Sequence, residues 1–305
     1  KNTEFALDIA YEEVALNLIP VIAKVTGLSG GHSGTDIHRG RGNAIKLLAR
    51  LLKHAREHAG CRVVSITGGT KHNAIPRDAE AVILVDGHDL AKLIMLTGAT
   101  DQSVRLELMG VDDQVRILIR QGEKGRYKVI TEENADRILN LIHGLPHGVV
   151  MMNPGCANAV MTSTNLAVCR TDNSRFSVLT NQRSAFKSSI EDISEMTASI
   201  GRLAGAAVTK AHDYPAWRPD FNSQLLAAAK NVYRDLFGSD PKVEVIHAGL
   251  ECAVFGARMK GLDMLSFGPT IEQAHSPSER VLIPTVERMW TFLGELLRSL
   301  SLRTE

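Results

Sequence analysis

His275 lies in a polar loop, a position from which a histidine can do chemistry. The apolar residues 262–267 before it predict a strand, and Gly268 and Pro269 then break regular structure. A neutral imidazole held on a loop at the end of a strand can act as a metal ligand or as a general base. The same pattern also describes an inert surface histidine, so the other motifs must decide between the two.

Four further residues occupy positions where a ligand could be held. His32 lies in the glycine-rich loop 30–34, where the backbone can approach a ligand closely. Asn73 lies between two predicted strands, and Arg183 ends a strand, where its guanidinium could hold a carboxylate with two hydrogen bonds. Gly249 precedes a helix and could offer its N–H to an anion. Each also has a structural interpretation, as a turn residue, an exposed strand end or a plain connection.

A pair of carboxylates, Glu132 and Glu133, follows an apolar strand and also has two interpretations. Such a pair can supply a catalytic acid beside a metal ligand. Thr131, however, suits the N-cap of a helix running to Leu141, with both glutamates in its first turn. We favour the helix cap.

The elements that position these residues begin with two similar patterns. The first is strand, helix, strand, strand, at residues 14–28, a helix from about Gly42, 62–66 and 79–85. The second has two strands, a helix and a strand, at residues 164–170, 176–182, 188–203 and 206–211. Residues 89–128 mix helical and strand signals. The two patterns predict a duplicated domain over residues 1–213, with two ferredoxin-like β-α-β-β layers.

A second domain is predicted from residue 214 to residue 305. Two prolines and a tryptophan in residues 214–220 indicate the boundary. Beyond it, helices and strands alternate, at residues 223–237 (helix), 243–246 (strand), 250–259 (helix), 262–267 (strand) and 284–300 (helix). Alternation of this kind predicts part of an α/β sheet covered by helices, so the predicted fold class of the chain is α/β.

Composition excludes several classes of protein. The 305 residues carry 35 basic and 34 acidic side chains, and this balance does not favour nucleic acid or an anionic membrane surface as partner. The four cysteines are widely spaced and predict reduced thiols in the cytoplasm rather than disulfides. No apolar run has the roughly 20 residues that a membrane span needs.

Taken together and in order, these motifs resemble the aminoacyl-histidine dipeptidases of the two-zinc aminopeptidase and carboxypeptidase superfamily. The segments that carry the resemblance are residues 30–34 (GGHSG), 36–38 (DIH), 42–44 (GNA), 73–77 (NAIPR), Arg183, 247–252 (HAGLEC), 268–270 (GPT) and 275–277 (HSP). The combination is more specific than any single motif, and it runs nearly end to end.

The resemblance implies a zinc-dependent hydrolase of dipeptides, with Xaa-His dipeptides as substrates. Residues 1–213 would be a lid inserted into a catalytic domain, of which residues 214–305 would be the C-terminal part. His275 would be a ligand of one of two zinc ions, and His32 would polarise the scissile carbonyl and stabilise the oxyanion. Asn73, Arg183 and Gly249 would hold the substrate, chiefly by its terminal carboxylate.

The sequence also departs from the family pattern. The remaining metal ligands and the general base of the family lie before its lid, and this chain has no match for them, so an N-terminal catalytic segment is expected as a partner. Two alternatives stay open: a non-catalytic dimerisation or small-molecule binding protein, and a related di- or tripeptidase of different specificity. A homodimer is a further expected assembly.

Overall fold

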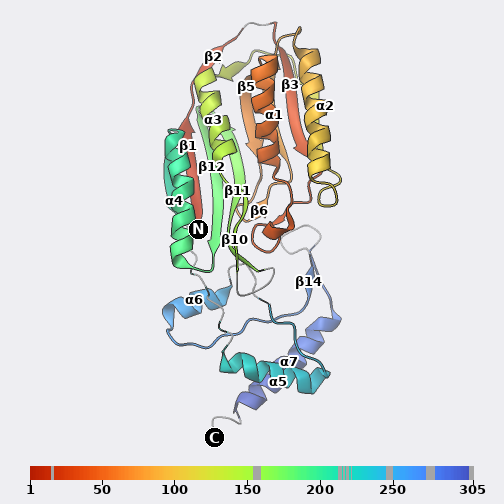
Figure 1. Cartoon of the computed structure of the whole chain (residues 1–305), viewed down its shortest axis with the longest axis vertical. Coiled ribbons are helices and arrows are strands. Elements are labelled where there is room, and N and C mark those ends of the chain that lie inside the picture. The colour runs from red at the N-terminus through yellow and green to blue at the C-terminus, as the bar shows by residue number, and fades with distance from the viewer. Residues whose placement is uncertain are drawn as a thin grey trace. The chain divides into compact units, whose positions relative to one another are not determined.

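The computed structural model describes residues 1–14, 17–153, 159–211, 215, 217, 220, 222–244, 250–272 and 279–301. The chain forms two compact units (Figure 1). Unit 1 comprises residues 1–184 and 188–213, and unit 2 comprises residues 185–187 and 214–305. Within the described part of the chain, no helix combines the length and the apolar character that a membrane crossing requires.

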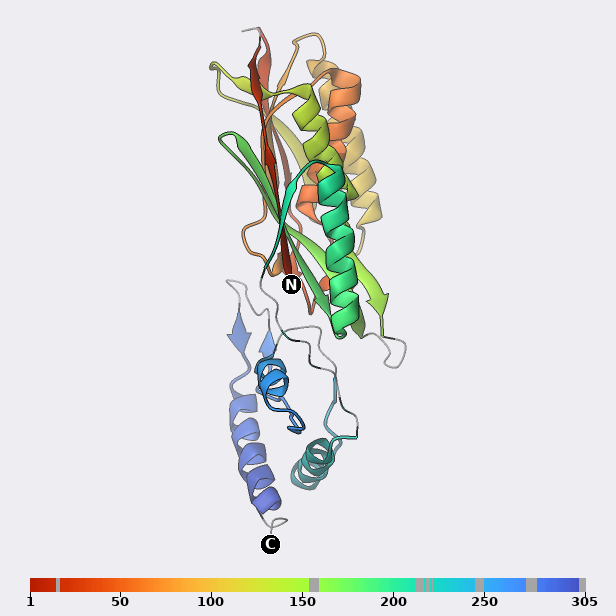
Figure 2. The same cartoon turned by 90° about the vertical axis from the view of Figure 1, so that its left-hand side faces the viewer.

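Unit 1 is built on a nine-stranded antiparallel sheet with four helices on one of its faces (Figure 2). The order of eight of the strands is β13-β1-β12-β11-β5-β7-β3-β8. The ninth strand, β10, pairs with β11 and is not part of this linear order. The strands are β1 (Asn2–Asp8), β3 (Ile19–Thr26), β5 (Arg62–Gly68), β7 (Ala79–Val85), β8 (Arg116–Gln121), β10 (Gly148–Met152), β11 (Val160–Asp172), β12 (Arg175–Ser184) and β13 (Ala207–Ala211). The helices are α1 (Ala44–Ala59), α2 (Leu90–Glu107), α3 (Glu132–Gly144) and α4 (Lys187–Leu203).

The sheet contains two copies of one topology. One layer runs β3-α1-β5-β7-α2-β8 with spatial order β5-β7-β3-β8, and the other runs β1-α3-β11-β12-α4-β13 with spatial order β11-β12-β1-β13. Both are β-α-β-β-α-β arrangements of the ferredoxin-like type, so the predicted pair of layers is confirmed. Strands β5 and β11 pair antiparallel, with Gly68 opposite Cys169 and Thr67 opposite Arg170. The two layers therefore form one continuous sheet.

The layers are not consecutive in the chain, and this corrects the prediction of two layers in tandem. β1 precedes the whole first layer but pairs with β12 and β13 of the second. The prediction of a single strand over residues 14–28 is also wrong, because the strand observed there is shorter. β3 begins only at Ile19, while the short strand β2 (Tyr11–Glu13) pairs with β9 (Lys128–Ile130) in a separate ribbon. These partners lie far apart in sequence, so the local pattern did not indicate them.

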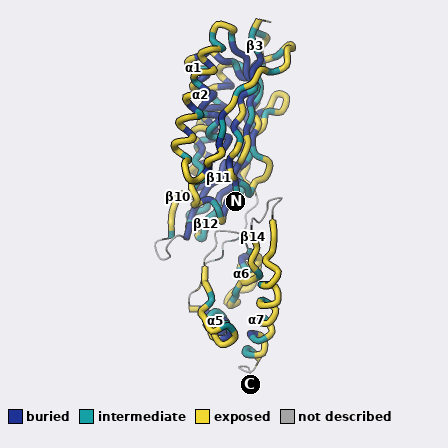
Figure 3. The backbone as a smooth tube through the Cα atoms, turned by 90° about the vertical axis from the view of Figure 1, so that its right-hand side faces the viewer, coloured by how far each residue is buried: buried dark blue, intermediate teal, exposed yellow. Residues whose placement is uncertain are grey.

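The core of unit 1 lies between the sheet and the helices (Figure 3). Apolar residues that alternate along the strands pack there against apolar residues at helical spacing. In β3, Val21, Ala23 and Val25 alternate toward the helices and are almost fully buried. In α1, residues at helical spacing, such as Leu48 and Leu52, face the sheet with no exposed surface. Each fully buried aliphatic side chain contributes about 1.5 to 3 kcal/mol to the transfer free energy that drives folding.

Asn43 begins α1 and also ties it to the sheet. Its Oδ1 accepts hydrogen bonds from the N–H groups of Ile45 and Lys46, at 3.0 and 3.3 Å, which caps the helix. Its Nδ2 donates to the carbonyl of Leu166 in β11, at 2.8 Å. One buried amide therefore satisfies two helix donors of the first layer and one strand acceptor of the second.

Lys46 joins α1 to the end of α3 in a similar way. Its Nζ donates to the carbonyl oxygens of Ile142, His143 and Leu145, at 3.0, 2.7 and 2.8 Å. These are carbonyls that the last turn of a helix leaves without an internal partner. Burial lowers the pKa of this lysine to about 8.

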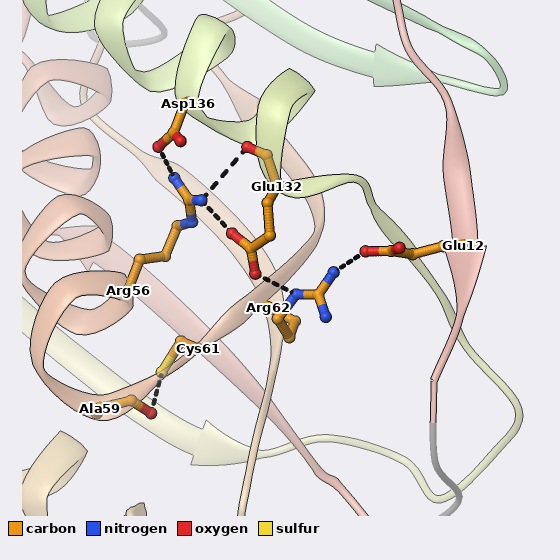
Figure 4. Close-up of polar contacts among 7 residues, drawn as sticks. All are labelled: Glu12, Arg56, Ala59, Cys61, Arg62, Glu132 and Asp136. Carbon is orange, nitrogen blue, oxygen red and sulfur yellow. Dashed lines mark hydrogen bonds and ion pairs between the residues drawn. The ribbon is translucent and has the colours of Figure 1, made fainter.

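The glutamate pair at residues 132 and 133 belongs to the helix start, as the sequence indicates. Figure 4 shows the contacts of Glu132. Glu132 forms ion pairs with Arg56 of α1 and with Arg62 of β5, the latter at 2.6 Å between Oε1 and Nε. Thr131 occupies the N-cap position, but its hydroxyl donates to Asn134 Oδ1 at 3.0 Å instead of accepting from the helix. The expected side-chain cap by Thr131 is therefore absent, while both glutamates do lie in the first turn.

Unit 2 contains α5 (Gln224–Phe237), α6 (Glu251–Arg258) and α7 (Pro284–Ser301), with a two-stranded ribbon of β14 (Ile271–Glu272) and β15 (Arg280–Val281). Apolar residues of α5 and α7 form its small core, around Ala228, Val232 and Phe292. The helices lie where the sequence predicts them.

The two strands predicted in this unit are not found among its described residues. Residues 262–267 form no strand, and neither do Val243 and Glu244, while residues 245 and 246 lie outside the described part. An apolar run becomes a strand only where a neighbouring strand supplies its hydrogen-bond partners. The strands described in this unit, β14 and β15, pair with each other, which leaves no such neighbour for residues 262–267.

We expect Asn43→Ala to lower the free energy of unfolding by about 2 kcal/mol, because the helix cap and the partner of a buried carbonyl are lost together. Urea denaturation followed by circular dichroism measures the change. Asn140→Ala, which removes an exposed hydrogen bond from Lys53, is the matched control and should cost less than about 0.5 kcal/mol. Equal stability of the two variants would contradict the role assigned to Asn43.

Candidate functional site

The candidate site lies where the loop after β3 meets strands β11 and β12 of the second layer. His32 lies in the short strand β4 (Gly31–His32), which pairs with β6 (Ala74–Ile75) so that His32 is opposite Ala74. The N–H of Ser33 donates to the carbonyl of Asn73 at 2.8 Å. The structure therefore brings two of the predicted site residues, His32 and Asn73, onto adjacent backbone segments.

The loop that carries His32 needs glycine and a carboxylate to hold its shape. Gly31 has a φ of 132°, and a Cβ added there would lie 2.8 Å from Asp36 Oδ2. That same Oδ2 accepts a hydrogen bond from the N–H of His32 at 2.9 Å. Arg41 Nη1 lies 3.7 Å from the other oxygen of Asp36. The glycine run noted in the sequence thus lets the backbone close tightly around Asp36 and present His32.

The imidazole of His32 is oriented by its own loop. Its Nδ1 accepts hydrogen bonds from the N–H groups of Gly34 and Thr35, at 3.3 and 3.2 Å. An imidazole nitrogen that accepts such bonds carries no proton, so the proton of the neutral ring lies on Nε2. His32 consequently presents an N–H donor on the side away from its loop.

Arg183 presents further N–H donors at the same place. On β12, Thr180 and Gln182 face the helix side, where they bond with Thr3, so Asn181 and Arg183 face the opposite side of the sheet. The Nη2 atom of Arg183 lies 3.5 Å from His32 Nε2. Because both atoms are donors, the arrangement suits a shared acceptor, such as a carboxylate or carbonyl oxygen within reach of both.

The charge of Arg183 is not neutralised by the described part of the chain. Burial lowers the pKa of its guanidinium, although an arginine remains protonated at any ordinary pH. No carboxylate among the described residues forms an ion pair with it. A half-buried cation of this kind is stabilised when a ligand supplies the missing negative charge.

Three residues that the sequence did not single out hold His32 and Arg183 in place. Ser33 Oγ accepts a hydrogen bond from Arg183 Nε at 3.3 Å and donates one to Asn181 Oδ1 at 3.3 Å. Asn165, opposite Asn181 on β11, donates from Nδ2 to the carbonyl of Ala74 at 2.9 Å. Asparagine within the apolar strands β11 and β12 was a usable signal in the sequence, but only the pairing of these strands shows that Asn165 and Asn181 lie opposite each other.

One acceptor of this group is left over. Asn165 is fully buried, and its Oδ1 has no hydrogen-bond partner among the described residues. A buried acceptor without a partner costs about 1 to 3 kcal/mol unless a water or a ligand N–H meets it. The group around His32 therefore combines donors for a ligand with one buried acceptor that has no partner among the described residues.

The other predicted site residues are placed less completely. The backbone of Asn73 supports Ser33, and its side-chain amide makes no hydrogen bond within the described part of the chain. Gly249 and His275 lie outside the described residues. Within the described ranges, no three His, Cys, Asp or Glu side chains gather as a group that could hold a metal ion. The zinc ligand predicted at His275 stays a prediction.

Comparisons with known proteins show what the chain is similar to. A family model described as a peptidase dimerisation domain matches residues 24–96, from β3 into α2. The cytosol non-specific dipeptidase of Escherichia coli is 35% identical over 274 residues, which are 90% of this chain and 56% of that protein. The crystal structure of aminoacylhistidine dipeptidase from Vibrio alginolyticus superposes with a TM-score of 0.85 at 33% identity, over 98% of this chain and 61% of that one.

The chain thus spans a little more than half the length of the two dipeptidases it matches. The resemblance seen in the motifs from residue 30 to residue 277 is confirmed by both comparisons. Over the part of their length that it spans, the chain is similar to these two dipeptidases in sequence and in fold, and its residues 24–96 match the peptidase dimerisation domain.

Proposed function

We propose that this chain serves the hydrolysis of dipeptides, as the lid and substrate-binding part of a zinc-dependent dipeptidase. One observation carries the proposal: His32 Nε2 and Arg183 Nη2 lie 3.5 Å apart, both as donors, with no carboxylate of the described residues between them. The relatives add support, since one is named as a non-specific dipeptidase and the other as an aminoacylhistidine dipeptidase. Dipeptides ending in histidine are the substrates we propose first.

Arg183 would bind the terminal carboxylate of the dipeptide. The hydrogen bond from its Nε to Ser33 Oγ fixes the plane of the guanidinium, which leaves the Nη atoms for the ligand. Asn73 and Gly249 would contribute further hydrogen bonds to the same end of the substrate. Binding the carboxylate in this way limits the length of the substrate, because a longer peptide would place a neutral amide against the arginine.

His32 would act on the scissile carbonyl. Its Nε2–H, held by the two backbone donors to Nδ1, is directed at an oxygen that gains negative charge during attack by water. Zinc would supply activation of that water, and His275 is the candidate zinc ligand of this chain. We place the remaining ligands and the general base in an N-terminal catalytic segment, a homodimer as the assembly, and the cytoplasm as the location.

Hydrolysis of alanyl-histidine in the presence of Zn²⁺ tests the proposal, with the 305-residue chain alone and with the N-terminal segment of the Escherichia coli relative added. We expect activity in at least one of the two assays. Amidation of the substrate's carboxylate should lower kcat/KM at least about 30-fold, since a charge-assisted hydrogen bond contributes roughly 2 kcal/mol or more. Absence of hydrolysis in both assays would reject the proposal.

Arg183→Ala should raise KM for the dipeptide about 30- to 100-fold with a smaller change in kcat, because it removes binding that ground state and transition state share. Arg183→Lys keeps the positive charge but loses the planar guanidinium and its paired N–H donors. Its KM should therefore lie between the KM of the unaltered protein and that of Arg183→Ala. Steady-state kinetics separate the two constants. A KM unchanged by Arg183→Ala would show that the carboxylate binds elsewhere.

His32→Ala should lower kcat about 100- to 1,000-fold with little change in KM, as expected for a donor that acts mainly in the transition state. His38→Ala is the matched control, because His38 is an exposed histidine of the same loop region. Its kinetics should equal those of the unaltered protein. If both variants lose activity equally, the effect comes from the loop and not from the His32 imidazole.

A further inference from the structure

Two histidines of α1 lie one helical turn apart on its exposed side. His54 and His58 are four residues apart in the helix, and both are exposed. Residues with this spacing lie one above the other on a helix surface, with their Cβ atoms about 5 to 6 Å apart. The centroids of the two imidazole rings are 6.4 Å apart, and the ring planes are tilted by 48°. The two rings are therefore neighbours on the surface of one rigid element.

The ring nitrogens of this pair are available to a ligand. Within the described ranges, the only polar contact of either ring is between His58 Nε2 and Glu57 Oε2, at 3.8 Å. This distance is too long for a hydrogen bond. The side chain of His58 is 49% exposed. The described contacts of the fold therefore give no structural reason for two histidines at this spacing.

We infer that His54 and His58 together bind a divalent transition-metal ion, with Zn²⁺ as the first candidate. Imidazole nitrogen is a good ligand for Zn²⁺, Ni²⁺ and Cu²⁺. Two nitrogens bound to one tetrahedral zinc ion lie about 3.3 Å apart, because each Zn–N bond is about 2.0 to 2.1 Å long. The rings reach this geometry by side-chain rotation alone, which is fast for exposed residues and needs no movement of the backbone.

The charges on this part of α1 favour a cation. The pair lies toward the C-terminal end of the helix, where the carbonyl groups carry partial negative charge. Glu57 adds a carboxylate beside His58, and its side chain is 71% exposed. Both effects lower the free energy of a bound cation.

Three basic side chains of α1 oppose this effect, and each is held by a contact with another part of the chain. Arg50 pairs with Glu107 at the end of α2, at 2.7 Å between Nη1 and Oε2. Lys53 and Arg56 donate to side chains of α3. The three cationic groups are therefore directed to partners on α2 and α3, and two of them are paired with carboxylates.

Two histidines leave part of the coordination shell to water. A tetrahedral zinc ion takes four ligands, so two water molecules complete the site and the ion remains exchangeable. The pair lies on a helix that covers one face of the sheet, whereas Arg183 faces the opposite side (Figure 2). An ion held by the pair makes no contact with a substrate bound at Arg183. The inference is independent of the dipeptidase activity and of His275.

Calorimetric titration of the metal-free 305-residue chain with Zn²⁺ tests this site. We expect one binding step to weaken at least about 100-fold in both His54→Ala and His58→Ala, because the second bond from one rigid helix forms within the same complex. His38→Ala, which removes an exposed histidine outside α1, is the matched control and should retain that step. If either α1 variant binds Zn²⁺ as the control does, the inference is wrong.

Chemical modification locates the ion at residue level and does not require a variant. Diethyl pyrocarbonate acylates exposed imidazoles, and mass spectrometry of the digested chain measures the extent at each histidine. Saturating Zn²⁺ should protect His54 and His58 and leave His38 reactive. Protection of only one member of the pair, of neither, or of all three histidines alike would overturn the inference.

Discussion

The antiparallel pairing of β5 with β11 is the contact on which the rest of unit 1 depends. It consists of few backbone pairs, Gly68 with Cys169 and Thr67 with Arg170, yet it converts two four-stranded layers into one sheet. Helices α1 and α3 reinforce it above the sheet, where Asn43 and Lys46 supply hydrogen bonds across the seam and Arg56 supplies ion pairs. Each of these polar groups is satisfied only when both layers are in place, so the seam is specific as well as stabilising.

The candidate site is a consequence of this seam. His32 and Asn73 come from the first layer, and Arg183, Asn165 and Asn181 from the second. The loop of His32 reaches the second layer through Ser33, whose hydroxyl bonds with Arg183 and Asn181, and through the carbonyl of Ala74, which bonds with Asn165. If the layers separated, the two donors that we propose for substrate recognition would no longer share an acceptor. Stability of the sheet and geometry of the site therefore rest on the same contacts.

The same arrangement also decides which side of the first layer the second layer leaves uncovered. Because the seam covers β5 and α1 within one chain, the open side of the first layer is α2 with β8. The exposed Met95, Leu106 and Met109 are on that side.

The sequence by itself determined the elements with strong local patterns. Helices α1, α3, α4, α5 and α7 follow from periodicity and helix-start residues, which act between neighbours in the chain. The motifs also sufficed to indicate the similarity to dipeptidases, because residue types and their order along the chain can be read without knowledge of contacts. Tertiary structure alone decided the pairing of β1 with β12, the roles of Ser33, Asn165 and Asn181, and the absence of a strand at residues 262–267. Each of these depends on hydrogen bonds between residues distant in sequence, and a local pattern carries no information about such partners.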